Sequence, residues 1–541
     1  MLEERHFSRA IDDIAAHGDN DTLPFDVDSR FIAASKDNLI KIALKFSSSI
    51  ESGGKDYALK KFNELPFFSE RLLTPAGPAG FRTTTKIHPF WNIYFNALGV
   101  AIAERHEPKR SSRAHSYRFL NSGVSLFDTE STWRKFREQT LSDCINSPST
   151  AVVVQTDISS FYEHIYHHRI QNFIASLFPD SSTLPIQVDR MLNNFSSGRS
   201  FGLPVGGQCA RILAELLMGQ IDNRLNDEGI IWRRYVDDFV LIANNQNSAY
   251  EVLSVLSHAL ADYGLSLSKT KTSILKVKHY EDYIRAQLGE HDESSNSLRE
   301  IDLHFDPYSD TAESDYEELK AAVNKLDIIK LVERELEKSQ PDNFIVTQIS
   351  RTLKLLPSNM ALEVTTSLLN PINLHAFRAS FSKIMRGIAA LREDETHQSI
   401  HSHIDLLLDL VPDHSKHLIT IDTNCLHYLR ALRFTHSEIR AKYVANLYKS
   451  SQIETIRKAC IDCWRHWKDR DRFIMLRNTW NSLRTEEQRM TWLAAAKFGD
   501  DGLFLKKQLR GSINKLWSLG FEGNEKNTFA STYMDWTEIE N

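Results

Sequence analysis

The stretch that decides the fold runs from residue 234 to residue 242 and reads RYVDDFVLI. Two adjacent carboxylates, Asp237 and Asp238, stand between the apolar runs 230–232 and 239–242. Two apolar runs joined by a short polar turn predict a β-hairpin. Paired carboxylates on such a turn suit Mg²⁺, which takes one or two protein carboxylates plus substrate phosphates. Because Asp is also common in ordinary turns, the pair alone leaves a metal site and a surface turn equally open.

A third carboxylate favours the metal site. Residues 151–154 form a continuous apolar run, typical of a buried strand, which leads to Asp157. A lone Asp at the end of a buried strand is costly unless it is paired or binds a metal. Two-metal phosphoryl transfer needs such an acid facing the hairpin. Downstream, the Gly-rich loop 201–209 enters a predicted helix, and its glycines permit close approach of a nucleotide or a template strand.

In this order the pieces resemble the reverse transcriptase family. The matching blocks cover roughly residues 150–275 and read DISSFY (157–162), SFGLPVGGQCARILAEL (200–216), YVDD (235–238) and GLSLSKTKT (264–272). The resemblance implies a nucleotidyltransferase in which Asp157 and Asp237 hold two Mg²⁺ ions, with Mn²⁺ as a substitute. Asp238 is then the partner carboxylate.

The same resemblance implies roles for other residues. Tyr162 falls at the aromatic gate that excludes the ribose 2′-OH, and Lys271 falls near the pyrophosphate leaving group. Gly206 and Gln208 would lie against the incoming base or the template.

Upstream, the segment 81–120 interleaves basic and aromatic side chains, a composition that suits phosphate contact and base stacking. The alternative is a solvated helix face with core aromatics. We expect Arg118, and with it Lys86, to approach the triphosphate, since Arg offers a bidentate fork.

Departures from the family pattern narrow the resemblance. Val205 stands where the family usually has Gln, Ala210 replaces a small hydroxyl residue, and Ser268 replaces Asn. The pattern resembles bacterial retron-type and abortive-infection enzymes more than retroviral or group II intron enzymes. Val205 lacks the amide commonly placed near the template strand, so ordinary templated copying is not implied.

Composition sets further limits. A length of 541 residues predicts more than one domain, and a formal net charge of −6 excludes a generally basic nucleic-acid coat. No apolar run reaches the roughly 18 residues of a membrane span, and the N-terminus lacks an apolar signal region, so a cytoplasmic location without membrane contact is expected. Five cysteines suit reduced thiols. Cys460 and Cys463 have no partner pair, which favours a buried helix face over a metal site.

The C-terminal half follows a helical period from about residue 315, with amphipathic units and short linkers that predict stacked helices. The expected fold is α+β: right-hand polymerase fingers and palm, an antiparallel sheet with helices, followed by an all-α, HEAT-like array. The expected domains are an N-terminal extension with fingers (1–150), a palm (151–280), a connector (281–315) and the helical domain (316–541).

Three functions remain open. A polymerase core with a long helical domain resembles the abortive-infection (Abi-type) class, which implies antiphage defence and synthesis of DNA from dNTPs without a template. It also implies priming on a protein hydroxyl, with the DNA product attached to the protein, and a homo-oligomer. The alternatives are an RNA-templated reverse transcriptase of retron or mobile-element type and an inactive nucleic-acid-binding scaffold. The intact set of Asp157, Asp237 and Asp238 argues against the scaffold, and the long array argues against a minimal retron enzyme.

Overall fold

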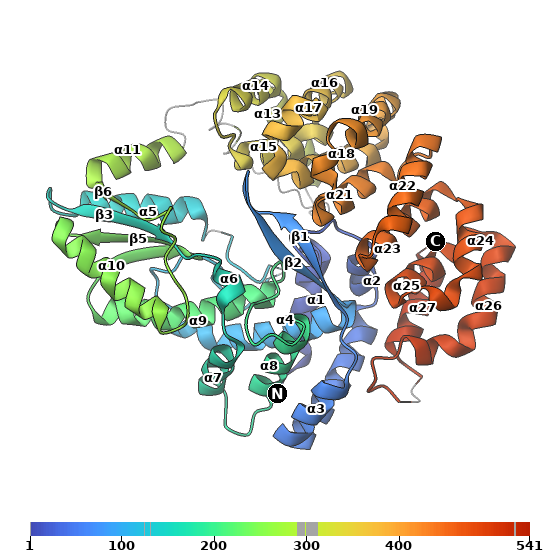
Figure 1. Ribbon diagram of the computed structural model, residues 1–541, viewed down its shortest axis with the longest axis horizontal. Helices are drawn as coiled ribbons and strands as arrows, with labels where there is room; N and C mark the ends of the chain where they lie inside the picture. The colour runs from blue at the N-terminus through green and yellow to red at the C-terminus, as the bar shows by residue number, and fades with distance from the viewer. Residues whose placement is uncertain are drawn as a thin grey trace.

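The computed structural model describes residues 2–123, 125–129, 131–288, 298, 312–523 and 526–540. A sheet-containing lobe, a central β-hairpin and a long run of helices curving around the hairpin make up the molecule (Figure 1). Most of the predicted connector 281–315 lies outside the described residues. Within the described residues, no helix has the length and apolar character needed to cross a membrane.

The predicted palm is a four-stranded antiparallel sheet. Its strand order is β4-β5-β3-β6, with β3 Val152–Asp157, β4 Ile231–Tyr235, β5 Asp238–Ala243 and β6 Ser273–Lys276. The predicted hairpin is confirmed, because β4 and β5 pair directly across a two-residue connection. β3 pairs with β5 on one side and β6 on the other, so it is a central strand.

Both faces of this sheet are covered, which explains the continuous apolar run in β3. Val153, Val240 and Ile242 face α5 and α11, and Val154 and Leu241 belong to the core under α9 and α10. Alternate side chains of a strand point to opposite faces, so a strand buried on both faces is apolar throughout. The covering helices are α5 Trp133–Ile145, α9 Gln208–Asp227, α10 Gln246–Ala261 and α11 Val277–Leu288.

A second sheet is the hairpin of β1 Ser69–Pro75 and β2 Phe81–Ile87, which occupies the centre of Figure 1. Helix α4 Pro89–His106 follows it and is buried along nearly its whole length. The N-terminal extension begins with helix α1 Glu4–His17. The other helices of this half are α2 Val27–Ala34, α3 Lys36–Glu64, η1 Glu107–Lys109, α6 Phe161–His164, α7 His167–Leu177 and α8 Leu184–Phe195.

From residue 312 onward the described chain is helical, as predicted, although the HEAT-like character stays a prediction. Cys460 and Cys463 lie buried on one helix of this part, α23, as expected. The helices are α13 Ala312–Asn324, α14 Ile328–Glu337, α15 Asn343–Thr352, η2 Leu353–Leu355, α16 Ser358–Leu369, α17 Pro371–Ala376, η3 Arg378–Ser380, α18 Phe381–Glu393, η4 Glu395–Ile400, α19 His401–His414, α20 Lys416–Ile419, α21 Asp422–Leu432, α22 Glu438–Ser450, α23 Glu454–Trp467, α24 Arg470–Asn478, η5 Trp480–Ser482, α25 Thr485–Ala495, α26 Gly499–Leu516 and α27 Phe529–Ile539.

The hydrophobic cores do not follow the predicted boundary at residue 315. The largest core joins side chains of residues 2–265 to side chains of residues 425–536. For example, Phe31 of α2 packs edge-on against Phe529 and Tyr533 of α27. Helices between residues 323 and 432 form a second core of their own. The last helices are therefore built into the same body as the fingers.

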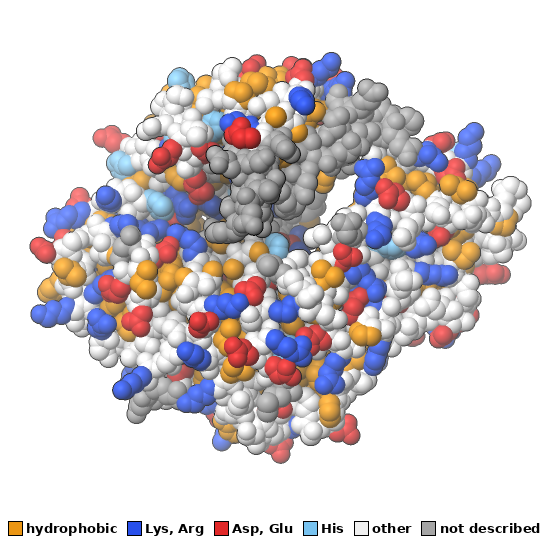
Figure 2. Space-filling view, turned by 180° about the vertical axis from the view of Figure 1, so that it is seen from behind, with side chains coloured by type: hydrophobic (Ala, Val, Ile, Leu, Met, Phe, Trp, Pro, Cys, Tyr) orange, Lys and Arg blue, Asp and Glu red, His pale blue; other side chains and the backbone are white. Residues whose placement is uncertain are grey.

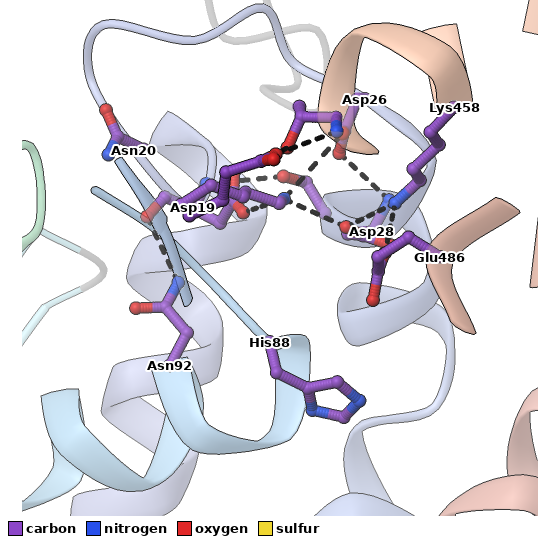
Figure 3. A network of polar contacts seen from close by, with 12 residues as sticks. Asp19, Asn20, Asp26, Asp28, His88, Asn92, Lys458 and Glu486 are labelled. Carbon is purple, nitrogen blue, oxygen red and sulfur yellow. Dashed lines mark hydrogen bonds and ion pairs between the residues drawn. The ribbon is translucent and has the colours of Figure 1, made fainter. Parts of the chain in front are cut away.

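A buried ionic network reinforces this junction (Figure 3). The Lys86 ammonium on β2 pairs with Asp19 and, at 2.8 Å, with Asp28 of α2. Lys458 of α23 contacts Asp28 at 2.6 Å and Glu486 of α25 at 3.1 Å. All five side chains are at most 4% exposed. Buried charges are tolerated only when paired, so this network requires the N-terminal segment, β2 and the C-terminal helices to assemble together.

We predict that Lys86→Met lowers the free energy of unfolding by about 3–5 kcal/mol, because the buried Asp19 carboxylate loses its bonded cation. Urea unfolding followed by circular dichroism measures this. The double variant Lys86→Met/Asp19→Leu should recover part of the loss. The exposed pair of Arg224 and Glu228 is the control, and Arg224→Ala should cost less than about 1 kcal/mol. A loss below about 1 kcal/mol for Lys86→Met contradicts the structural role.

Candidate active site

The register of the central sheet brings the three predicted carboxylates together. Asp157, the last residue of β3, lies directly opposite Asp238, the first residue of β5. Asp237 precedes Asp238 at the hairpin tip. Val236, the other tip residue, has φ +58°, a backbone conformation that strains a β-branched residue. Such strain persists only where the surroundings enforce it, and here it fixes the direction of the acidic tip.

Arg234, which lies in strand β4 just before the tip, holds Val236 in this conformation. Its fully buried guanidinium forms two bonds to Glu215, at 2.8 and 3.0 Å, and two to Asp222, both at 2.7 Å. The same guanidinium donates to the Val236 carbonyl at 3.2 Å. Ser116 accepts a bond from the Val236 N–H at 2.9 Å and donates to Glu215 at 2.6 Å. The strained tip is thereby fixed at both backbone groups.

Lys271 joins the carboxylates from the loop before β6. Its ammonium donates to Asp157 Oδ2 at 2.9 Å, and its side chain is 64% exposed. The loop is held by a bond from the Ser268 N–H to the Asp157 carbonyl at 2.7 Å. Burial opposes the charged form, but the bond to Asp157 raises the pKa of Lys271. The structure therefore places the Lys271 ammonium beside Asp157, and its role near the pyrophosphate stays a prediction.

The carboxylates carry more negative charge than this one cation offsets. Burial, followed by repulsion from Asp157 and Asp238, raises the pKa of Asp237 to about 7. Burial and Asp157 also raise the pKa of Asp238. A divalent cation would relieve this repulsion, and carboxylate oxygens are the ligands that Mg²⁺ prefers.

The donor set suits a site that is completed by substrate. In the described part of the chain, no three His, Cys, Asp or Glu side chains already surround a single point. Lys271 occupies one oxygen of Asp157 instead. Because Mg²⁺ usually combines one or two carboxylates with substrate phosphates, Asp157, Asp237 and Asp238 fit as ligands of a metal that arrives with a triphosphate.

Tyr162 lies beside this group, close enough for Asp237 to influence its pKa. Burial, together with Tyr117, raises the pKa of Tyr162 well above its ordinary value. Arg211 of α9 lies over the Tyr117 ring, 5.0 Å from its centre, and pairs with Asp21. Tyr117 has φ +48°, again a conformation that must be enforced. The proposed sugar gate is thus backed by a second tyrosine and an arginine.

Gly206 and Gln208 are used for packing against the N-terminal segment. Gly206 has φ +111°, and a Cβ at this position would lie 2.3 Å from the Asn20 side chain. Gln208 donates to Asp13 at 2.9 Å and accepts from Arg211 at 2.8 Å. The close approach that requires glycine here is therefore to Asn20. Contact of either residue with a base or template stays a prediction.

The structure does not bring Lys86 to the carboxylates, since its ammonium is buried against Asp19 and Asp28. Arg118 is also engaged: its guanidinium contacts Glu107 at 2.7 Å and the Ser111 carbonyl at 2.8 Å. These contacts leave Lys86 no ammonium face for a triphosphate. The aromatic rings that were expected to stack on bases are also unavailable to a ligand. Phe90, Trp91 and Tyr94 are fully buried in the core. For these rings the alternative, core packing, is correct.

Two groups of functional residues escaped the sequence analysis. Glu215 and Asp222 are seven residues apart on α9, so they share a helix face, and both are buried. Two acids at this spacing in an apolar helix were a usable signal for a buried cation such as Arg234. By contrast, Tyr117 lies in the basic and aromatic segment 81–120, whereas Arg211 carries no local pattern, because a fold-level contact brings the two together.

The pKa of Asp237 predicts how pH affects the metal-free protein. Its folded pKa of about 7 lies above the ordinary 3.8, so its contribution to stability is present below pH 4 and is lost as pH rises through 7. Asp237→Asn removes this loss. At each pH we compare the melting temperature of the variant with that of the unsubstituted chain, in EDTA. The difference should favour the variant more at pH 8 than at pH 5. Asp180→Asn, at an exposed position, is the control and should show no such difference. An equal offset at both pH values for Asp237→Asn would contradict the prediction.

Comparison with known proteins gives a family match over this segment and similarity to telomerases. Residues 106–296 match the family model for reverse transcriptase (RNA-dependent DNA polymerase). Telomerase reverse transcriptase of Mus musculus is 32% identical over 77 residues, which cover 14% of this chain and 7% of the relative. Among solved structures, telomerase of Candida albicans in complex with a fragment of telomeric RNA has a TM-score of 0.31 at 11% identity, covering 64% of this chain and 67% of the other. Apo telomerase of Candida tropicalis has a TM-score of 0.30 at 11% identity, covering 71% and 74%.

The matched segment contains all three carboxylates, Lys271 and Tyr162, whereas Lys86 lies outside it. It spans the sheet and the hairpin that present those carboxylates. The match over residues 106–296 therefore indicates a nucleotidyltransferase of the RNA-directed DNA polymerase family.

Proposed function

We propose that the chain is a DNA polymerase that adds dNTPs at the centre formed by Asp157, Asp237 and Asp238. The observation that carries the proposal is the register of β3 and β5, which sets Asp157 opposite Asp238 with Asp237 on an enforced tip. Lys271 supplies a cation on the same group. This arrangement matches what phosphoryl transfer requires, namely positioning and charge stabilisation.

Each residue of the site would have a separate role in the reaction. The three carboxylates would hold two Mg²⁺ ions, or Mn²⁺, which when bound neutralise triphosphate charge and favour the ionised attacking hydroxyl. Lys271 is protonated beside Asp157, and its ammonium would stabilise the negative charge of the leaving pyrophosphate. Tyr162 would close the space beside the ribose and exclude a 2′-OH.

The wider role rests on the resemblance to abortive-infection enzymes. We propose that the chain acts in antiphage defence in the cytoplasm, as a homo-oligomer, and primes on a hydroxyl of its own so that the DNA product stays attached. The long helical part, which shares its largest core with the fingers, supports an enzyme of this larger class rather than a minimal retron enzyme. Val205 in place of the family's usual Gln supports synthesis without a template.

One observation favours a second candidate, templated synthesis. A cavity of about 200 Å³ lies between the β1–β2 hairpin and the Gly-rich loop, and Arg71, Arg199 and Phe201 are among its lining residues. Basic and aromatic side chains around an open space suit a strand of nucleic acid. An RNA template therefore stays open as a partner.

The first prediction from this proposal concerns catalysis. Asp237→Asn should fold normally yet lower dNTP incorporation by at least about 100-fold, because it removes an anionic metal ligand. The assay uses purified protein, Mg²⁺ and radiolabelled dNTPs, with and without an RNA template and DNA primer. Asp180→Asn is the control and should retain activity. Retained incorporation in Asp237→Asn would refute the assignment.

The same assay separates the two candidates. Label that migrates with the unsubstituted protein on a denaturing gel, without added template or primer, supports priming on the protein. Incorporation that appears only when template and primer are added supports the templated alternative and refutes protein priming.

The second prediction concerns sugar selectivity. Tyr162→Val should raise the efficiency of rNTP incorporation relative to dNTP by about 10- to 200-fold, because a smaller side chain leaves room for the 2′-OH. Tyr162→Phe keeps the ring and serves as the matched control, with selectivity expected to remain. Unchanged selectivity in Tyr162→Val would remove Tyr162 from the gate.

A further inference from the structure

A close crossing of two C-terminal helices gathers basic side chains. α15 and α18 approach at Gly387, where a Cβ would lie 2.1 Å from the Ser350 carbonyl oxygen. Arg351 and Arg386 are the chain neighbours of these two contact residues, so the crossing brings them to one place. Lys383 lies three residues before Arg386, on the same side of α18.

The β1–β2 hairpin adds a fourth cation. β1 docks on the N-terminal end of α21: the Leu73 N–H donates to Asp422 at 2.7 Å, and Thr423 donates to Thr74 at 2.9 Å. Arg82 of β2 is the register partner of Thr74. This docking sets Arg82 at the junction, within the electrostatic reach of Lys383.

These four side chains, Arg82, Arg351, Lys383 and Arg386, are named the junction cluster. Within the described residues none of them forms an ion pair with a carboxylate, and the side chains of Arg82 and Lys383 make no hydrogen bond to the protein. Arg82, Arg351 and Arg386 are exposed. Burial and the three arginines lower the pKa of Lys383 to about 8. Several uncompensated cations in one place are the expected signature of an anion-binding surface.

The junction cluster is local rather than part of a basic coat. Figure 2 shows Lys and Arg interspersed with Asp and Glu over the described residues of one face, in keeping with the net charge of −6. Asp21 is the acidic side chain that partly offsets the charge around Lys383 and Arg386. Its carboxylate is already paired with Arg211.

This pairing also connects the junction cluster to the catalytic centre. Arg211 bonds Asp21 and lies over Tyr117, which stands beside Tyr162. The segment after Asp21 is fixed onto the array, since His427 contacts the Thr22 carbonyl at 3.1 Å and Arg386 contacts the Leu23 carbonyl at 3.2 Å. The ion pair of Asp21 and Arg211, followed by Tyr117, therefore lies between the junction cluster and Tyr162.

We propose that the junction cluster binds the phosphates of a single nucleic-acid strand that reaches the catalytic centre, so that the helical part supplies a section of the strand's path. The proposal rests on the proposed polymerase function for its choice of ligand. A strand fits better than a free nucleotide, because the cations are spread over β2, α15 and α18 instead of converging on the carboxylates. A polyanion with regularly spaced charges can contact several of them at once.

Binding of a fluorescein-labelled 20-nucleotide single-stranded DNA of mixed sequence, followed by anisotropy in EDTA without dNTPs, tests the proposal. The variant is Arg82→Gln/Lys383→Gln, since neither side chain bonds another described group. The control is Lys507→Gln/Arg510→Gln on exposed positions of α26, which changes the charge equally. The variant should bind about tenfold or more weakly near 100 mM salt. The slope of log affinity against log salt concentration should become less steep by about 1.4, because two phosphate contacts are lost.

Several outcomes would overturn the proposal. The first is that the unsubstituted chain does not bind the oligonucleotide at about 50 mM salt. The second is that variant and control bind it with equal affinity. The third is that the variant loses affinity for free dATP while its affinity for the oligonucleotide is unchanged. Arg351→Gln, whose partner Gln348 lies in the same helix, is a second variant that should flatten the salt dependence by about 0.7. Incorporation that persists in Asp237→Asn would refute the polymerase while leaving the binding result to stand alone.

Discussion

The pairing of Arg234 with Glu215 and Asp222 is the interaction on which the catalytic geometry depends. A guanidinium fully removed from water is stable only with its charge and donors satisfied, and here two carboxylates of α9 accept both of its edges. The same group holds the Val236 carbonyl, so the helix determines the conformation of the hairpin tip. A tip fixed in this way can carry two adjacent carboxylates against their mutual repulsion. The register of β3 then brings in Asp157 without further adjustment.

Sequence patterns predicted the hairpin and the strand that carry the three carboxylates, but they did not predict the contacts around them. The acidic hairpin and the buried strand before Asp157 are local features with periodicity and turn chemistry, and both lie where predicted. Lys86 failed as a prediction because its role depends on Asp19 and Asp28, and no local pattern announces those partners. The fingers aromatics failed for a related reason. A helix buried on all sides looks, in sequence, like a helix that offers rings to a ligand.

The N-terminal segment after α1 connects parts of the molecule that are distant in the chain. Asn20 donates to the carbonyls of Thr85, on β2, and Val205, in the Gly-rich loop. Asp28 joins Lys86 to Lys458 of the C-terminal helices. The largest hydrophobic core runs across the same junction. The last helices are consequently built into the body of the N-terminal half. Helices α15 and α18 belong to the second core and reach that half through α21, which packs against both α18 and β1.

The central claim is that Asp157, Asp237 and Asp238 form one metal-dependent nucleotide site beside Tyr162. A crystal structure of the protein with Mn²⁺ and a non-hydrolysable α,β-imido dNTP, phased with manganese anomalous data, measures this directly. The account predicts anomalous peaks among the three carboxylates, with Lys271 near the β- and γ-phosphates and the ribose against Tyr162. A nucleotide bound elsewhere, or manganese that avoids these carboxylates, would contradict it.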